Sequence, residues 1–322
     1  MNSLIGKIAL GATLIAGLST PVWAGSLTVY SAGPDNLIER LAGDFSAETG
    51  VRVNVFQGTT GTVLARLEAE QANPQADVFI SASWDSAQDL KAQGLLQPYQ
   101  SPNAAQVPDF LKDSHFVAQG VSALAMVWNR NSHTPMPADW SDAADPAYRD
   151  QVTMPDPAQS GTAYQLVTGL LSSRGEEGTW ALFERLKENG LAVPGPNARA
   201  LNPVLQGAKS VVFGAVDYIA LEQQANGEAI EVIFPASGTV IAPRPMMILK
   251  SSRNQEQAMA FVDFVLSGQG QARVAEVYLM PARSDIAAER PTINELALIP
   301  VDDAAMAARR EQILERFRNA AM

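Results

Sequence analysis

A loop of glycines and hydroxyl side chains, residues 58–61, offers the clearest chemistry in the sequence. Residues 51–55 before it alternate between apolar and polar types, as in a strand. Residues 63–67 after it carry apolar side chains at helical spacing. A helix start presents free backbone N–H groups and the positive end of the helix dipole. We therefore expect Thr59 and Thr60 to stand at an anion-binding position.

A second loop of the same kind, Ser160-Gly161-Thr162, opens another expected helix later in the chain. Phosphate and phosphonate groups offer three strong acceptor oxygens, which backbone N–H groups and hydroxyls satisfy well. Two such loops, facing each other from separate lobes, would hold a small anion between them. Structural turns alone would also explain hydroxyl- and glycine-rich loops.

The first 24 residues are typical of a cleavable signal peptide. Lys7 precedes a short apolar run, Ile8 to Ile15, and Val22-Trp23-Ala24 ends in the small-residue pattern of a cleavage site. The run is short for a membrane span. We expect cleavage before Gly25 and export to the periplasm.

Charge and cysteine content limit the partners of the exported chain. The whole sequence has 23 basic and 34 acidic residues and no cysteine. Removal of Lys7 leaves 22 basic residues, so the mature net charge is 22 − 34 = −12. This charge argues against nucleic acid as a partner. Without cysteine there is neither a disulfide nor a thiolate metal site, and we expect a freely diffusing monomer.

An alternation of strands and helices from Leu27 to Leu96 predicts an α/β fold with a parallel sheet. In such sheets ligands bind beyond the carboxyl ends of the strands. Besides residues 58–61, two small hydroxyl-rich loops fall there. They contain four further candidate site residues, Ser31, Gly33, Ser81 and Ser83.

Two extended apolar segments, residues 116–129 and 242–249, indicate crossings between two lobes. We expect residues 25–118 to form the first part of lobe 1 and residues 119–243 to form lobe 2. Residues 244–322 would then return to lobe 1 with the C-terminal helices, including an amphipathic helix over 303–318.

Several strings resemble the periplasmic solute-binding proteins of ABC importers, in the branch that includes ferric-iron and 2-aminoethylphosphonate binders. They are Thr28–Gly33, Phe45–Val51, Ala76–Ala82, Gly94–Tyr99 and Asn254–Gly270. The resemblance covers nearly the whole mature chain. It implies the two-lobe periplasmic binding fold of type 2, each lobe a mainly parallel sheet flanked by helices, with two hinge strands. It also implies an ABC permease as partner.

The iron ligands of that branch are absent from the corresponding positions. Pro34, Ala82 and Val216-Asp217 stand where iron binders carry a histidine, a carboxylate and two tyrosines. Ferric iron prefers charged oxygen donors, which proline, alanine and valine do not supply. The resemblance places Ser160, Gly161 and Thr162 on the anion loop of the second lobe and Asn197 on a nearby polar position. We therefore expect an anion site with no metal and no cofactor.

For each of three residues the sequence allows two interpretations. Asp217 caps a helix or contacts an ammonium or hydroxyl of the ligand. Tyr218 walls the ligand or packs in the core. Arg244, between two prolines in the second crossing, pairs with the anion or fixes the hinge.

The favoured function is capture of a small phosphonate or organophosphate, of the 2-aminoethylphosphonate or sugar-phosphate type, for an ABC permease. The alternative is a binder of ferric iron or of an inorganic oxyanion such as molybdate. A remote alternative is an exported enzyme of the phosphatase type. The sequence has two histidines and no apparent catalytic constellation, so we expect no enzymatic activity.

Overall fold

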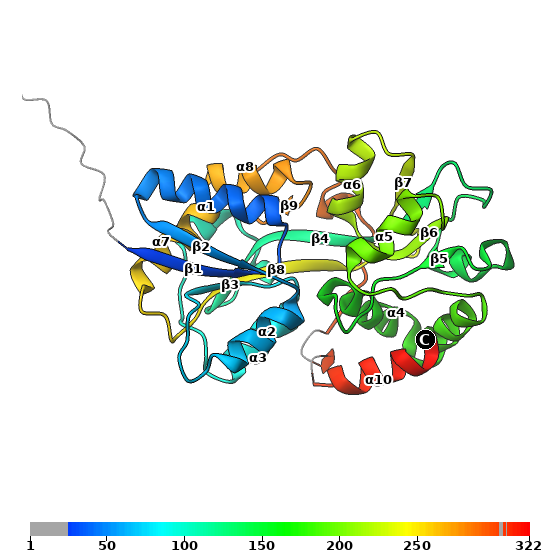
Figure 1. Ribbon diagram of the computed structural model, residues 1–322, viewed down its shortest axis with the longest axis horizontal. Helices are drawn as coiled ribbons and strands as arrows, with labels where there is room; N and C mark the ends of the chain where they lie inside the picture. Colours follow the sequence, from blue (N-terminus) through cyan, green and yellow to red (C-terminus); the bar gives the residue numbers. More distant parts are fainter. Residues whose placement is uncertain (1–24, 303–304, 307) are drawn as a thin grey trace, which may run out of the picture.

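The computed structural model describes residues 25–302, 305–306 and 308–322, so the expected signal segment lies outside the described residues. The chain forms two lobes joined side by side along its long axis, each with helices on both faces of its strands (Figure 1). One hydrophobic core fills the first lobe, and a larger and a smaller core lie in the second. The expected two-lobe α/β fold is confirmed.

The first lobe follows the predicted order of strands and helices. Its elements are β1 (Ser26–Ser31), α1 (Asp35–Thr49), β2 (Arg52–Gln57), α2 (Thr60–Ala69), β3 (Val78–Ile80) and α3 (Trp84–Ala92). Helix α1 buries an apolar stripe that includes Leu37, Leu41 and Phe45. It ends at Gly50, whose φ of 76° is a left-handed conformation that glycine adopts without strain.

Two long strands carry the chain across between the lobes. They are β4 (Phe116–Asn129) and β8 (Ile241–Ile248), which pair antiparallel. The first half of β4 also pairs with β9 (Met280–Pro281), and its second half pairs with β6 and β7 of the second lobe. One strand therefore belongs to both lobes.

The second lobe contains β5 (Val152–Thr153), α4 (Gly161–Glu188), α5 (Asn197–Leu205), β6 (Val211–Val216), α6 (Asp217–Ala225) and β7 (Ile230–Ile233). Helix α4 is broken at Gly175, where φ is 71° and ψ is 177°, so two helical segments follow each other. Short 3-10 turns cover Pro102–Gln106, Asp109–Leu111, Trp140–Ala144, Pro146–Tyr148 and Ile293–Glu295.

The strands run in the order β2-β1-β3-β8-β4-β6-β5, and the sheet is mixed rather than mainly parallel. Strands β1, β2 and β3 are mutually parallel, and so are β5 and β6. The crossing strands β4 and β8 run antiparallel to their neighbours, because each returns the chain between the lobes. The carboxyl ends of β1 and β3 in the first lobe, and of β5 and β6 in the second, lead into the loops that face the boundary between the lobes (Figure 1).

The C-terminal region divides between the lobes, which differs from the expected return of residues 244–322 to lobe 1. Helices α7 (Gln255–Val265) and α8 (Gly268–Glu276) pack in the first core, but α10 (Arg310–Ala321) packs against α4 of the second lobe (Figure 1). The Phe317 ring lies 5.1 Å from that of Phe183, centroid to centroid. An amphipathic pattern predicts that a helix packs, but not on which core.

Candidate functional site

Helices α2 and α4 both begin at hydroxyl residues near the boundary of the lobes. Thr59 caps α2 by accepting the Thr62 N–H at 3.2 Å, and Ser160 caps α4 by accepting the Ala163 N–H at 3.2 Å. The capping side chains leave other N–H groups of the first turns without intrahelical partners. Because both helices begin near the boundary between the lobes, the positive ends of their dipoles lie there as well.

Buried hydroxyl groups cluster on the first-lobe side. The Thr60 hydroxyl accepts the Ala82 N–H at 3.3 Å and lies 3.5 Å from the Ser81 oxygen. Ser86, which sequence analysis did not select, donates to Ser81 at 2.7 Å, and the Ser83 hydroxyl donates to Asp85. The one sequence signal for Ser86 is that it continues the run of serines at positions 81 and 83.

Ser31 and Gly33 lie beside this cluster at the end of β1. The Ser31 hydroxyl accepts the Gly33 N–H at 3.0 Å, and the Gly33 carbonyl accepts the Gln57 amide at 2.5 Å. Gln119 of β4 approaches the same loop with a buried side-chain oxygen that has no partner among the described residues. These contacts fix the shape of the loop.

The predicted second-lobe residues form one connected group. The Ser160 hydroxyl lies 2.9 Å from that of Thr162 and donates to the Asn197 oxygen at 3.1 Å. Asn197 is the first residue of α5, so its side chain joins the starts of two helices. Ser160 and Thr162 are buried, and Asn197 is half-buried.

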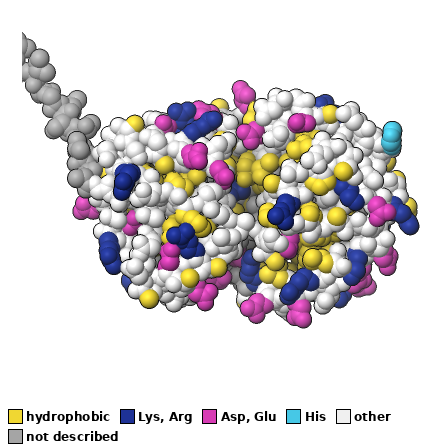
Figure 2. Space-filling model, in the orientation of Figure 1, with side chains coloured by type: hydrophobic (Ala, Val, Ile, Leu, Met, Phe, Trp, Pro, Cys, Tyr) yellow, Lys and Arg dark blue, Asp and Glu magenta, His cyan; other side chains and the backbone are white. Residues whose placement is uncertain are grey.

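The two groups meet across the lobes. A Cβ atom placed on Gly161 would lie 2.8 Å from the Ser83 Cβ and 3.2 Å from the Ala82 carbonyl oxygen. The lobes are therefore closed on each other here, and glycine permits the approach. In Figure 2 their boundary is a furrow across the middle of the visible face. The loops that follow β1, β2, β3 and β5 thus meet at the boundary between the lobes.

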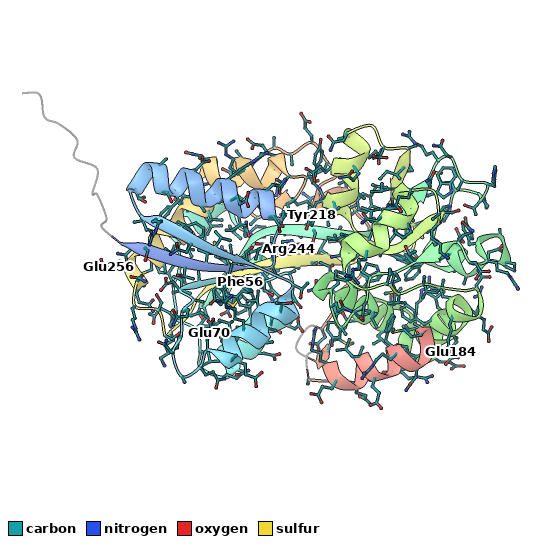
Figure 3. The ribbon with its side chains drawn as sticks, viewed as in Figure 1. Phe56, Glu70, Glu184, Tyr218, Arg244 and Glu256 are labelled. Atoms are coloured by element: carbon teal, nitrogen blue, oxygen red, sulfur yellow. The ribbon has the colours of Figure 1, made fainter. Side chains whose placement is uncertain are left out.

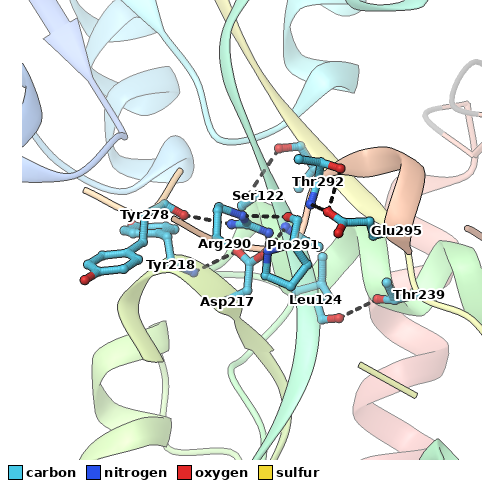
Figure 4. Close-up of polar contacts among 12 residues, drawn as sticks. Ser122, Leu124, Asp217, Tyr218, Thr239, Tyr278, Arg290, Pro291, Thr292 and Glu295 are labelled. Carbon is cyan, nitrogen blue, oxygen red and sulfur yellow. Dashed lines mark hydrogen bonds and ion pairs between the residues drawn. The ribbon is translucent and has the colours of Figure 1, made fainter. Parts of the chain in front are cut away.

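Asp217 is held in a buried ion pair. Its Oδ2 lies 2.6 Å from Arg290 Nη2 and also accepts the Ala123 N–H at 2.8 Å, and its Oδ1 accepts the Tyr218 N–H at 2.7 Å (Figure 4). Both side chains are fully buried. Burial raises the pKa of Asp217, while Arg290 and the two N–H donors oppose that rise. The geometry favours a structural role for Asp217 over contact with a ligand.

Arg290 belongs to a third crossing, residues 283–300, which sequence analysis did not recognise. The Ser284 N–H of this segment donates a hydrogen bond to the first lobe, and the Ile299 N–H donates one to the strand region of the second lobe. Arg290 also donates to the Tyr278 carbonyl at 2.7 Å (Figure 4). A single arginine in a polar segment offers no sequence signal for a partner 73 residues away.

Tyr218 and Arg244 lie together between the lobes (Figure 3). The Arg244 guanidinium carbon is 5.1 Å from the centroid of the Tyr218 ring, and Nη1 donates to the Ala32 carbonyl at 3.1 Å. Burial raises the pKa of the Tyr218 phenol, and the Arg244 charge opposes the rise. Arg244 therefore links the β1 loop of the first lobe to α6 of the second.

A hollow of about 660 Å³ lies between α2 and α3 on the outside of the first lobe, and Ser86 of the hydroxyl cluster is among its lining residues. Its lining is largely apolar, and three carboxylates, Glu68, Glu70 and Asp89, outnumber the one cation, Lys250. These carboxylates disfavour an anion, so we place the candidate site in the cleft. Within the described residues no three His, Cys, Asp or Glu side chains converge as metal ligands. In the same part of the chain, no helix is long and apolar enough to cross a membrane.

Comparisons with known proteins define the class. The model of the family described as bacterial extracellular solute-binding protein matches residues 73–307, so this chain belongs to that family. Members are periplasmic components of ABC transporters that bind small ligands and deliver them to a permease. The relatives are binding proteins rather than enzymes.

Two curated relatives and one solved structure illustrate the range of the family. A putative 2-aminoethylphosphonate-binding periplasmic protein of Salmonella typhimurium is 26% identical, with 88% of this chain and 86% of the relative covered. The iron uptake protein A1 of Synechocystis is 28% identical, with 80% and 75% covered. The structure of AfuA from Actinobacillus pleuropneumoniae, with fructose-6-phosphate bound, matches with a TM-score of 0.85 at 23% identity, covering 93% and 99%.

Proposed function

We propose that this protein captures a small phosphonate or organophosphate in the cleft between its lobes and delivers it to an ABC permease. The observation that carries the proposal is the contact of the hydroxyl-capped start of α4, at Gly161, with Ala82 and Ser83 of the opposite lobe, beside the start of α2. Thr60, Ser83, Ser160 and Thr162 are buried around that contact. A phosphorus oxyanion is the ligand head whose acceptor oxygens match these donors.

The energetics of such a site are sufficient for capture. Charge-assisted hydrogen bonds contribute roughly 1.5–3 kcal/mol each. Four or five of them reach micromolar affinity or tighter after the cost of ordering ligand and lobes is subtracted. Because the donors come from both lobes, the ligand binds the closed form more tightly and shifts the equilibrium toward it.

The relatives support an organic phosphorus ligand without selecting one. One is named for 2-aminoethylphosphonate, and AfuA was solved with fructose-6-phosphate. Because another relative is named as an iron uptake protein, ferric iron is the alternative ligand. The Asp217 carboxylate, which stands at one of the positions where iron binders carry tyrosines, is already bonded to Arg290.

Calorimetry and thermal shift with a ligand panel test the proposal. The panel contains 2-aminoethylphosphonate, fructose 6-phosphate, 3-phosphoglycerate, inorganic phosphate, molybdate and ferric citrate. We expect reversible 1:1 binding of one organic phosphorus compound, without release of phosphate. Tight binding of ferric iron or molybdate in place of those compounds contradicts the proposal, and catalytic turnover contradicts the binding role.

The double variant Thr60→Val, Thr162→Val tests the position of the site. Loss of two hydroxyls facing the ligand should weaken binding roughly 10-fold or more. Thr49→Val is the matched control, because the Thr49 hydroxyl bonds to the Phe45 carbonyl at the far end of α1. Unchanged affinity in the double variant would show that the anion binds elsewhere.

A further inference from the structure

Arg244 is a buried cation between the lobes (Figure 3). Its residue is 1% exposed, and it lies in β8, opposite Gly120 of β4. The neighbouring Pro245 carbonyl accepts the Ser81 N–H at 2.9 Å, so the strand that carries Arg244 is tied to the hydroxyl cluster of the first lobe.

The guanidinium of Arg244 is only partly satisfied. It donates to the Ala32 carbonyl and stacks over Tyr218, but Nε is buried and has no hydrogen-bond partner within the described part of the chain. No carboxylate among the described residues lies within 4.0 Å of it. A guanidinium stays ionised at all ordinary pH values, so the charge cannot be lost by deprotonation.

The nearby carboxylates do not compensate this charge. Asp217 directly precedes Tyr218 in the chain, but its two oxygens are bonded to Arg290 and to backbone N–H groups. Asp35 and Glu222 act on Tyr218 only through their charge; Asp35 is exposed and Glu222 half-buried. Among the residues that the structure describes, Arg290 thus pairs with a buried anion and Arg244 does not. An unpaired buried charge is strongly unfavourable unless a ligand supplies its counter-ion.

We propose that Arg244 is a ligand-binding residue that pairs with an anionic group of the ligand in the closed cleft. The proposal rests on the proposed function and narrows its substrate class. A group that carries negative charge is favoured next to Arg244, and an ammonium group there is repelled by the guanidinium. The Asp217 carboxylate offers an ammonium no compensating partner, because it is already bonded to Arg290. Phosphate esters without an ammonium group are therefore preferred over 2-aminoethylphosphonate.

The test compares Arg244→Met and Arg244→Lys with the wild type. Titration calorimetry uses 3-phosphoglycerate, fructose 6-phosphate, 2-aminoethylphosphonate, sulfate, citrate and molybdate as probes. For the tightest anionic probe we expect Arg244→Met to lose roughly 10- to 150-fold in affinity. Arg244→Lys keeps the charge but loses the planar fork, so its affinity should lie between the two.

A second readout separates ligand binding from a hinge role. Removal of an uncompensated buried charge should leave the unfolding temperature of the ligand-free protein unchanged or raise it. If Arg244→Met and Arg244→Lys lose affinity equally and both lower that temperature, Arg244 only fixes the hinge and the proposal is wrong. Wild-type affinity in Arg244→Met, or tighter binding of 2-aminoethylphosphonate than of any phosphate ester, also overturns it.

The outcomes distinguish this proposal from the proposed function. Arg244-dependent binding of citrate, sulfate or molybdate alone would support Arg244 and contradict the phosphorus ligand. If a phosphate ester binds the wild type and Arg244→Met equally well, the phosphorus ligand is supported and the role of Arg244 is contradicted. If the wild type binds no anion of the panel, both are wrong.

Discussion

Arg310 and Asp85 form an ion pair between the two lobes. Arg310 Nη1 lies 2.7 Å from Asp85 Oδ2. Arg310 begins α10 on the second lobe, and Asp85 lies in the first turn of α3 on the first. The guanidinium carbon also lies 4.2 Å from the centroid of the Tyr164 ring, which holds the arginine on the second lobe. The pair therefore forms only when the lobes are closed.

Replacement of Arg310 by Gln should weaken ligand binding without removing any residue proposed to contact the ligand. A partly exposed pair of this kind contributes about 0.5–1.5 kcal/mol, so we expect roughly 2- to 12-fold lower affinity. The loss should arise from faster dissociation, because the closed state is destabilised. Calorimetry measures the affinity, and stopped-flow kinetics measures the dissociation rate constant.

The matched control is Arg316→Gln in the same helix. Arg316 pairs with Glu184 of α4 at 3.0 Å, entirely within the second lobe. Its removal should leave affinity unchanged. Equal losses in the two variants would mean that α10 acts through the stability of the second lobe rather than through closure.

Gly161→Ala should oppose closure sterically. The added methyl group would lie 2.8 Å from the Ser83 Cβ, which is closer than real Cβ atoms approach each other. We expect at least roughly 10-fold weaker binding and a larger radius of gyration with ligand present, while the ligand-free protein remains as stable as the wild type. Calorimetry and small-angle scattering measure these effects.

Gly178→Ala is the control in the segment of α4 that follows the break at Gly175. Its new Cβ would lie 3.4 Å from the Arg174 Cβ, an ordinary contact. Alanine favours a helix interior over glycine by about 0.5–1 kcal/mol, so stability should rise and affinity should stay constant. Normal closure of Gly161→Ala would show that the contact of Gly161 with Ser83 is not maintained in the bound protein.

Arg290→Met should destabilise the whole protein. It leaves the fully buried Asp217 carboxylate without its cation, which typically costs about 3–5 kcal/mol of the free energy of unfolding. The double variant Arg290→Met, Asp217→Leu removes both charges and should recover most of that loss. Urea unfolding measures the free energies of unfolding from which the coupling between Arg290 and Asp217 is calculated. If Arg290→Met alone is neutral, the pair does not hold the third crossing in place.

The loops of the first lobe were predictable because their signals are local. Alternating and helical periods define strand and helix, and glycines and hydroxyl residues mark the turn between them. Parallel strands then bring Ser31, Thr60 and Ser81 to one edge of the sheet, as the hydrogen bonds around Ser81 and Thr60 show. The grouping of these residues follows from the order of strands, not from any single motif.

The partners of charged residues could not be predicted, because they depend on contacts between distant segments. Asp217 pairs with Arg290 and Asp85 with Arg310, 225 residues apart in the second case. Arg244 had two interpretations from the sequence, and only its burial without a carboxylate favours one of them. The third crossing likewise consists of irregular backbone, which has no period to recognise.

The pH dependence of binding should follow the ligand and not the protein. Arg244 remains charged, and burial raises the pKa of Tyr218 above its usual value of 10.0, so a phenolate cannot form beside Arg244 below pH 9. His115 bonds to Ser114 and Asp113 on the surface of the first lobe, outside the cleft. A phosphate monoester gains its second charge near pH 6, so its affinity should rise between pH 5 and about pH 7.5 and then stay level to pH 9. Sulfate keeps a constant charge over this range and should bind equally at every pH. If sulfate binding changes near pH 6.5, a titrating protein group contacts the anion and the assignment of Arg244 as its counter-ion is wrong.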